Sequence, residues 1–156
     1  MELSTEKFLV KSSTLLVDTN SMPEFVDITD KVLKAVDETG IKDGMVCVFS
    51  RHTTAGVTIQ ENEPLLLNDI SSMLDRLVPP TIRYGHNDFG IRTVHMEEDE
   101  CPNGHSHCQH LIIGNSETVP IIDGKLALGK WQKIFVVELD DNKIIPREIL
   151  VQTMGI

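Results

Sequence analysis

Three of the six histidines lie close together in residues 103–114, Asn-Gly-His-Ser-His-Cys-Gln-His-Leu-Ile-Ile-Gly. The apolar Leu-Ile-Ile at the end of this stretch predicts the buried half of a β-strand, entered from a polar loop. Alternate side chains of a strand share a face, so His105 and His107 would point the same way, with Cys108 and His110 on the other face. Neutral imidazole is the commonest protein ligand for zinc and its neighbours, so the pair predicts two ligands of a metal site. The alternative is that these histidines only form hydrogen bonds at the mouth of the strand.

A metal site needs further ligands from elsewhere in the chain. His52 follows an apolar segment, where an open site would form at a strand end, and is favoured as the third ligand or a catalytic group; the alternative is a turn histidine that caps the strand. Glu61 lies at a junction of strand and helix, from which it could point into the same pocket as a base or as an orienting group. His86, in a long polar loop, is the candidate general acid or base, or a fourth ligand.

The segments that would position these side chains mix strands and helices. Alternating or continuous apolar patterns predict strands at 7–17, 45–50, 57–60, 134–139 and 149–152, and a hairpin at 121–126. The run 45–50 is apolar throughout, as expected of a strand buried on both faces. Capping residues and apolar stripes predict helices at 27–40 and 64–78. Residues 81–102 show little periodicity and are expected to form a long functional loop.

Composition limits the class of protein. Its 156 residues, 40% hydrophobic and 24% charged, predict one globular domain over residues 1–156. A net charge of −10 argues against binding to nucleic acid. There is no apolar run of the ~18 residues that a membrane span needs, and the first residues lack a signal-peptide pattern, so a cytoplasmic location is expected. The odd count of three cysteines favours free thiols.

Four motifs in this order resemble those of the YjbQ-like proteins, also called the secondary thiamine-phosphate synthase family. They are Ser-Arg-His-Thr-Thr-Ala-Gly-Val-Thr-Ile-Gln-Glu-Asn (50–62), Tyr-Gly-His-Asn-Asp (84–88), Asn-Gly-His-Ser-His (103–107), and the segment 116–132 that ends in Gly-Lys-Trp-Gln. The resemblance implies an α+β fold with a large antiparallel β-sheet or sandwich and two to three helices. It also implies a homotrimer with pockets near the subunit boundaries.

The resemblance further implies a set of functional positions. The family's polar positions fall here on His52, Glu61, His86, Asn103 and His107, and its tail motif on Trp131 and Gln132. We therefore expect His86, Glu61 and Asn103 to be catalytic and His52, His105 and His107 to bind the metal. The chain departs from the family in two places: His105 stands where an aspartate is frequent, and Lys130 replaces a threonine. Imidazole in place of carboxylate favours zinc, with magnesium as the alternative.

The activity implied by the resemblance is weak synthesis of thiamine phosphate, in which a hydroxymethylpyrimidine diphosphate is joined to a thiazole phosphate. Four cationic side chains are candidates for binding the phosphates of such a substrate: Arg51, Arg83, Lys125 and Lys130. Two other classes use the same residues, a metal-dependent hydrolase of a small phosphorylated substrate and a non-catalytic protein that binds a metal or a small ligand. The expected partner is a small phosphorylated substrate, and no contact with nucleic acid or membrane is expected.

Overall fold

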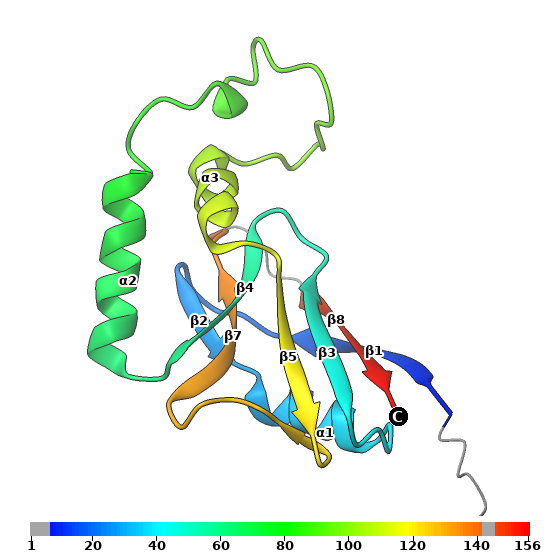
Figure 1. Ribbon diagram of the computed structural model, residues 1–156. Helices are drawn as coiled ribbons and strands as arrows, with labels where there is room; N and C mark the ends of the chain where they lie inside the picture. Colours follow the sequence, from blue (N-terminus) through cyan, green and yellow to red (C-terminus); the bar gives the residue numbers. More distant parts are fainter. Residues whose placement is uncertain (1–6, 142–145) are drawn as a thin grey trace, which may run out of the picture.

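Two antiparallel sheets packed face to face form the body of the protein (Figure 1). The computed structural model describes residues 7–141 and 146–156. One sheet has five strands in the order β1 (Leu9–Val17), β8 (Arg147–Gly155), β3 (Gly44–Ser50), β5 (Ser116–Ile122) and β6 (Lys125–Leu126). The other has three, in the order β2 (Glu24–Asp27), β7 (Gln132–Glu138) and β4 (Ala55–Glu61). The helical elements are α1 (Thr29–Asp37), α2 (Pro64–Leu77), the short 3₁₀ helix η1 (Gly85–Asn87) and α3 (Gly104–Ile113). The predicted α+β fold with an antiparallel sandwich and two to three helices is confirmed.

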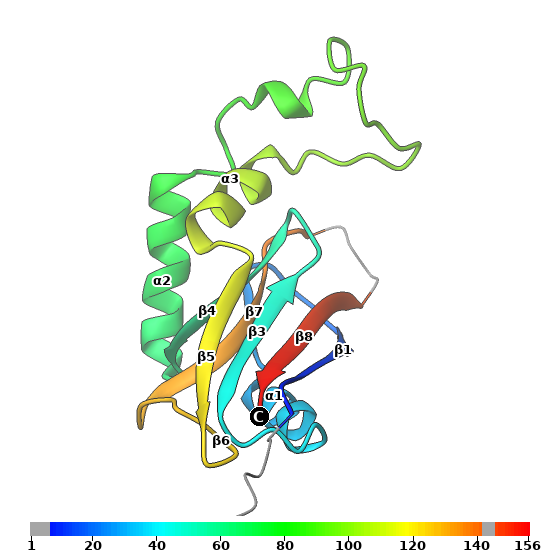
Figure 2. The ribbon, with the colours of Figure 1, turned by 45° about the vertical axis from the view of Figure 1, so that its right-hand side comes forward.

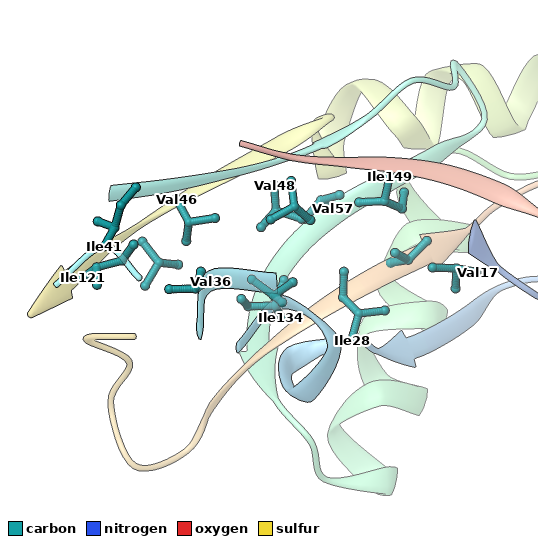
Figure 3. Close-up of a cluster of buried hydrophobic side chains, with 14 residues drawn as sticks. Val17, Ile28, Val36, Ile41, Val46, Val48, Val57, Ile121, Ile134 and Ile149 are labelled. Carbon is teal, nitrogen blue, oxygen red and sulfur yellow. The ribbon is translucent and has the colours of Figure 1, made fainter. Parts of the chain in front are cut away.

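The main core lies between the two sheets and is closed at one end by α1 (Figure 3). Side chains on alternate positions of the facing strands fill it, among them Val48 of β3 and Ile149 of β8. Strand β7 is buried on both faces: Ile134 points into this core, and Phe135 packs under α2 against Leu74. Strand β7 therefore lies between the five-stranded sheet and α2, which accounts for the continuous apolar run at residues 134–137.

The outer face of the five-stranded sheet is not covered by a helix within the described ranges (Figure 2). Met45, on the outer side of β3, is 45% exposed, whereas Val46 beside it is fully buried. The expectation that both faces of this strand are buried is therefore wrong for the single chain. The outer face carries apolar side chains that the described residues leave partly exposed.

The predicted helices are present close to their expected limits. Helix α1 starts at Thr29, whose backbone N–H and hydroxyl both donate to Asp27 Oδ1. Helix α2 starts at Pro64, and the carboxylate of Glu63 caps it by accepting from the backbone N–H groups of Leu65 and Leu66. An acidic cap of this kind satisfies backbone donors that have no partner within the helix. The hairpin turn at Asp123 and Gly124 is also confirmed, since both residues have positive φ angles.

The histidine-rich stretch is a helix, α3, and its prediction as a strand is wrong. A short apolar run does not distinguish a strand from a helix. The leucine of this run, Leu111, is 84% exposed rather than buried. Residues two apart on a helix lie roughly 200° apart around its axis, so His105 and His107 face different ways. On a helix His105 shares a side with Gln109, and His107 shares a side with His110.

Residues 78–103, which we call the arm, run from α2 to α3 and extend beyond the end of the sandwich (Figures 1 and 2). The predicted long loop is thus confirmed, interrupted only by η1. Within the arm, Arg92 forms an ion pair with Glu100 at 3.3 Å and donates hydrogen bonds to the carbonyl oxygens of His86 and His95. These contacts join residues near η1 to the segment that leads into α3.

The sequence was expected to have no membrane span and to belong to a cytoplasmic protein. None of the helices in the described part of the chain has the length and apolarity needed to span a bilayer. The amino-terminal segment used for the cytoplasmic expectation includes residues 1–6, which lie outside the described residues.

Candidate functional site

A hollow of about 550 Å³ lies where the arm, the start of α3 and the adjacent ends of β3, β7 and β8 meet. We call it the histidine hollow. Its lining residues are Arg51, His52, Thr53, Thr54, His86, Arg92, His95, Glu97, Glu100, Asn103, His107, Asp140 and Arg147. Segments far apart in the sequence thus bring four histidines, three arginines and three acidic side chains to one open space.

His86 and His107 form a pair of neighbouring rings in this hollow. Their centroids are 4.6 Å apart and the rings meet edge to face, at 66°. The pair is held by the contact between η1 and α3, in which the backbone N–H of Gly104 donates to Asn87 Oδ1 at 2.8 Å. Gly104 permits this contact, since a Cβ atom there would lie 2.7 Å from Tyr84 Cβ.

The environment of His107 favours a neutral ring. Burial lowers the pKa of His107 below its ordinary value, the nearby His86 lowers it further, and Asp140 acts in the opposite direction. His86 Nε2 is buried and has no hydrogen-bond partner. A neutral imidazole accepts a proton or a hydrogen bond, so the pair is suited to proton transfer with a bound ligand.

Asn103 presents a hydrogen-bond acceptor to the hollow. It is 5% exposed, and its Nδ2 donates to Asp140 Oδ2 at 2.9 Å. A carboxylate only accepts hydrogen bonds, so the group that faces Asp140 must be the amide nitrogen. The amide oxygen, Oδ1, therefore points away from Asp140. Oδ1 is buried and has no partner. Since a buried acceptor without a partner is costly, Asn103 is suited to accept an N–H or O–H group from a ligand.

His52 leaves the end of β3 and is held by β8. Its Nε2 accepts a hydrogen bond from the backbone N–H of Glu148 at 2.8 Å. Burial lowers the pKa of His52, and the guanidinium group of Arg147 lowers it further. Arg147 is itself almost fully buried, in an ion pair with the equally buried Glu138. His52 is therefore also a neutral ring at pH 7.

The structure brings four of the six predicted site residues into the hollow: His52, His86, Asn103 and His107. His105 lies elsewhere, buried with its ring centroid 6.3 Å from that of Tyr84. It was expected beside His107 only because α3 had been predicted as a strand.

Glu61 does not line the hollow either. It ends β4, paired with Gln132, whereas His52 precedes the other end of the strand. Seven strand residues span roughly 20 Å, so Glu61 and His52 lie at opposite ends of the sheet in the single chain. Trp131, next to Gln132 in the tail motif, belongs to the same remote end.

The three predicted metal ligands, His52, His105 and His107, do not come together to form one metal site. His52 Nε2 is already an acceptor, and His105 is outside the hollow. Among the residues with a described position, no three His, Cys, Asp or Glu side chains are grouped so that they could hold a metal ion. Cys108 is exposed and does not line the hollow. We therefore derive no chemical step through a metal.

Three buried charged residues at the hollow were missed from the sequence: Glu138, Asp140 and Arg147. A signal for Arg147 existed, because strand alternation places it on the same face as the buried Ile149 and Val151. Of the predicted phosphate partners, only Arg51 lines the hollow. Arg83 pairs with Asp88, and neither residue lines it.

The fold and the hollow define a small α+β sandwich protein with a histidine-lined pocket at one end of its sheets. The family model described as UPF0047 protein YjbQ-like matches residues 13–156. The chain belongs to this family, which confirms the resemblance seen in the motifs.

Relatives and solved structures agree with this assignment. A UPF0047 protein of Methanothermobacter thermautotrophicus is 40% identical over 146 residues, covering 94% of this chain and 93% of the relative. The UPF0047 protein YugU of Bacillus subtilis is 33% identical, covering 91% and 98% of the two chains. The crystal structure of a YbjQ-like protein of unknown function from Sulfolobus solfataricus superposes with a TM-score of 0.85 at 32% identity, covering 96% of this chain and 100% of that one. The names of these proteins state a family and not an activity.

Proposed function

We propose that the histidine hollow is the active site of an enzyme acting on a small phosphorylated substrate, and that its reaction is the weak synthesis of thiamine phosphate. The observation that carries the proposal is the pair of adjacent rings, His86 and His107, in the same hollow as the guanidinium groups of Arg51 and Arg147. Acidic side chains also line the hollow, so the guanidinium groups act as directed hydrogen-bond donors to an anionic substrate and not through a net positive charge of the hollow.

The chemistry of the proposed reaction matches these groups in part. The C–O bond to the diphosphate breaks, the diphosphate leaves with the bonding electrons, and the thiazole nitrogen forms the new C–N bond. Guanidinium donors stabilise negative charge that grows on the leaving group. Asn103 Oδ1 suits the amino group of the pyrimidine as an acceptor, and His107 suits proton exchange with the bound reactants. Acidic side chains line the hollow, but among the residues that the structure describes they are not grouped closely enough to carry Mg²⁺, which prefers oxygen ligands. A slow side reaction agrees with this arrangement.

The test is the formation of thiamine phosphate by the purified protein, measured after oxidation of the product to its fluorescent thiochrome. We expect His107→Asn to lower the rate by about 10²- to 10⁴-fold, the usual contribution of general acid–base catalysis. His110→Asn is the matched control, since His110 lies one turn further along α3 and does not line the hollow. Full activity of the His107 variant would refute the assignment.

Metal binding is the second candidate, and the buried, unpartnered Nε2 of His86 beside His107 favours it. Zinc would suit these two nitrogens, with the remaining ligands from a substrate or water, as in a metal-dependent hydrolase or a metal-binding protein. Metal analysis of untagged protein incubated with zinc tests this. About one zinc ion per chain, lost in both His86→Gln and His107→Asn, supports zinc binding, and a content near zero rejects it.

We also propose that the protein is a homotrimer. The uncovered outer face of the five-stranded sheet supports this, because Val10, Leu16 and Ile122 there are more than half exposed. The arm adds exposed Ile91 and Val94. Sedimentation equilibrium should give three times the chain mass of 17.4 kDa, and a monomer mass would reject the trimer.

A further inference from the structure

We infer that His52 and Arg147 together form a preformed corner of the histidine hollow that receives one anionic oxygen of the ligand, such as a phosphate oxygen. The choice of a phosphorylated ligand rests on the proposed function, whereas the corner follows from hydrogen-bond geometry alone. In this assignment His52 is a hydrogen-bond donor and neither a metal ligand nor a general base.

The tautomer of His52 follows from its contact with β8. The backbone N–H of Glu148 donates to Nε2 at 2.8 Å, so Nε2 carries no proton. A neutral imidazole has one protonated nitrogen, and Nδ1 must therefore carry it. The lowered pKa of His52 agrees with a ring that is neutral.

The guanidinium group of Arg147 supplies a second donor at the same place. Its Nε and Nη2 donate to the carboxylate of Glu138, and Nη2 also donates to Thr54 Oγ1 at 3.3 Å. The remaining nitrogen, Nη1, lies 3.5 Å from His52 Nδ1. Both of these nitrogens bear hydrogens, so they cannot bond to each other. Two adjacent donors with no acceptor between them are complementary to an oxygen that accepts from both.

The corner is rigid before any ligand arrives. Arg147 begins β8 and is 2% exposed. Its partner Glu138 also accepts from Thr19 Oγ1 and from the backbone N–H groups of Leu139 and Asp140. Donors fixed in this way bind charge without the cost of reorganisation. Arg51, which precedes His52, also lines the hollow, and its guanidinium group is paired at 3.1 Å with the exposed carboxylate of Glu148.

The first measurement is a long-range ¹H–¹⁵N correlation spectrum of the wild-type protein, which distinguishes the two neutral tautomers of a histidine. We expect His52 to be protonated on Nδ1, with its signals moving on addition of inorganic phosphate or diphosphate. Protonation on Nε2 would overturn the inference.

The second measurement is calorimetric titration of inorganic phosphate and diphosphate into two matched variants. In His52→Gln the amide oxygen can reach the Nε2 position and keep the bond to Glu148, but the donor at Nδ1 is lost. In His52→Asn the amide N–H falls near the Nδ1 position, so a donor is kept. A hydrogen bond to a charged group contributes about 1.5–3 kcal/mol, which corresponds to a loss of about 10- to 150-fold for the glutamine variant. The asparagine variant should lose less.

The outcomes separate this inference from the proposed function. Loss of phosphate binding in His52→Gln without any thiamine phosphate synthesis by the wild-type protein would support the corner and reject the reaction. Synthesis by the wild-type protein, with unchanged phosphate affinity in His52→Gln, would support the reaction and overturn the corner.

Discussion

The buried ion pair between Arg147 and Glu138 gives the sharpest prediction for stability. Both side chains are within a few per cent of full burial; Arg147 lines the hollow, and Glu138 is not among the lining residues. Replacing Arg147 by methionine leaves the carboxylate of Glu138 buried without its cation. Removing one partner of such a pair costs about 3–5 kcal/mol, a large part of the roughly 5–15 kcal/mol that holds a domain folded.

The matched control is Arg51→Met, which removes the same side chain from a surface pair. Arg51 and Glu148 are 3.1 Å apart, but their side chains are 58% and 49% exposed. Exposed pairs contribute about 0–1 kcal/mol, because water and salt screen them.

Urea unfolding followed by far-ultraviolet circular dichroism measures both variants, at one protein concentration because oligomers are stabilised by mass action. We expect Arg147→Met to lower the free energy of unfolding by at least 2 kcal/mol more than Arg51→Met, by the difference between these magnitudes. Thr19 and two backbone N–H groups still donate to Glu138 in this variant. Because they partly stabilise the carboxylate, we expect a loss near the lower end of the range of about 3–5 kcal/mol. Equal losses in the two variants would refute the view that the buried pair stabilises this end of the sandwich.

Two further predictions concern the contact of η1 with α3 and the buried rings. Gly104→Ala should lower the free energy of unfolding by about 1–3 kcal/mol and weaken activity, because the added Cβ displaces Tyr84. Gly85→Ala is the control and should be near neutral, because no atom lies within 4 Å of its added Cβ. Thermal unfolding and the synthase assay compare the two variants, and equal effects would contradict the packing argument. Burial lowers the folded-state pKa of both His107 and His110, so the unfolded chain binds protons more readily and stability should fall as the pH drops below about 6.5. Urea midpoints between pH 7.5 and pH 5 measure this, and the slope should lessen in His110→Gln; a slope unchanged by that substitution would show that His110 does not contribute.

Much of the fold could be predicted from local patterns. The hydrogen bond from Thr29 to Asp27, the proline at the start of α2 and the Asp-Gly turn each depend on interactions within a few residues, which the order of residues alone sets. The motifs around His52, His86 and His107 also placed the chain in its family, because they require only the residue types and their order.

The histidine stretch shows where local patterns are not enough. Its three apolar residues suit a strand or a helix equally, and the helix is consistent with tertiary contacts: Gln109 donates to Asp75 Oδ1 and to the carbonyl oxygen of Val78, while Gly104 packs under Tyr84. The change from strand to helix turned His105 away from His107. It thereby removed the predicted metal ligand set.

The sequence by itself determined the family, most of the strands and helices, and the types of side chain available for chemistry. The tertiary structure alone decided which of those side chains meet. His52 and Glu61 are nine residues apart yet lie at opposite ends of β4, whereas His52 and Arg147 are in contact across 95 positions. The reason is physical. An extended strand advances about 3.3 Å per residue, so residues close in sequence become widely separated along it. Pairing of β3 with β8 places segments that are distant in sequence within a few ångströms of each other.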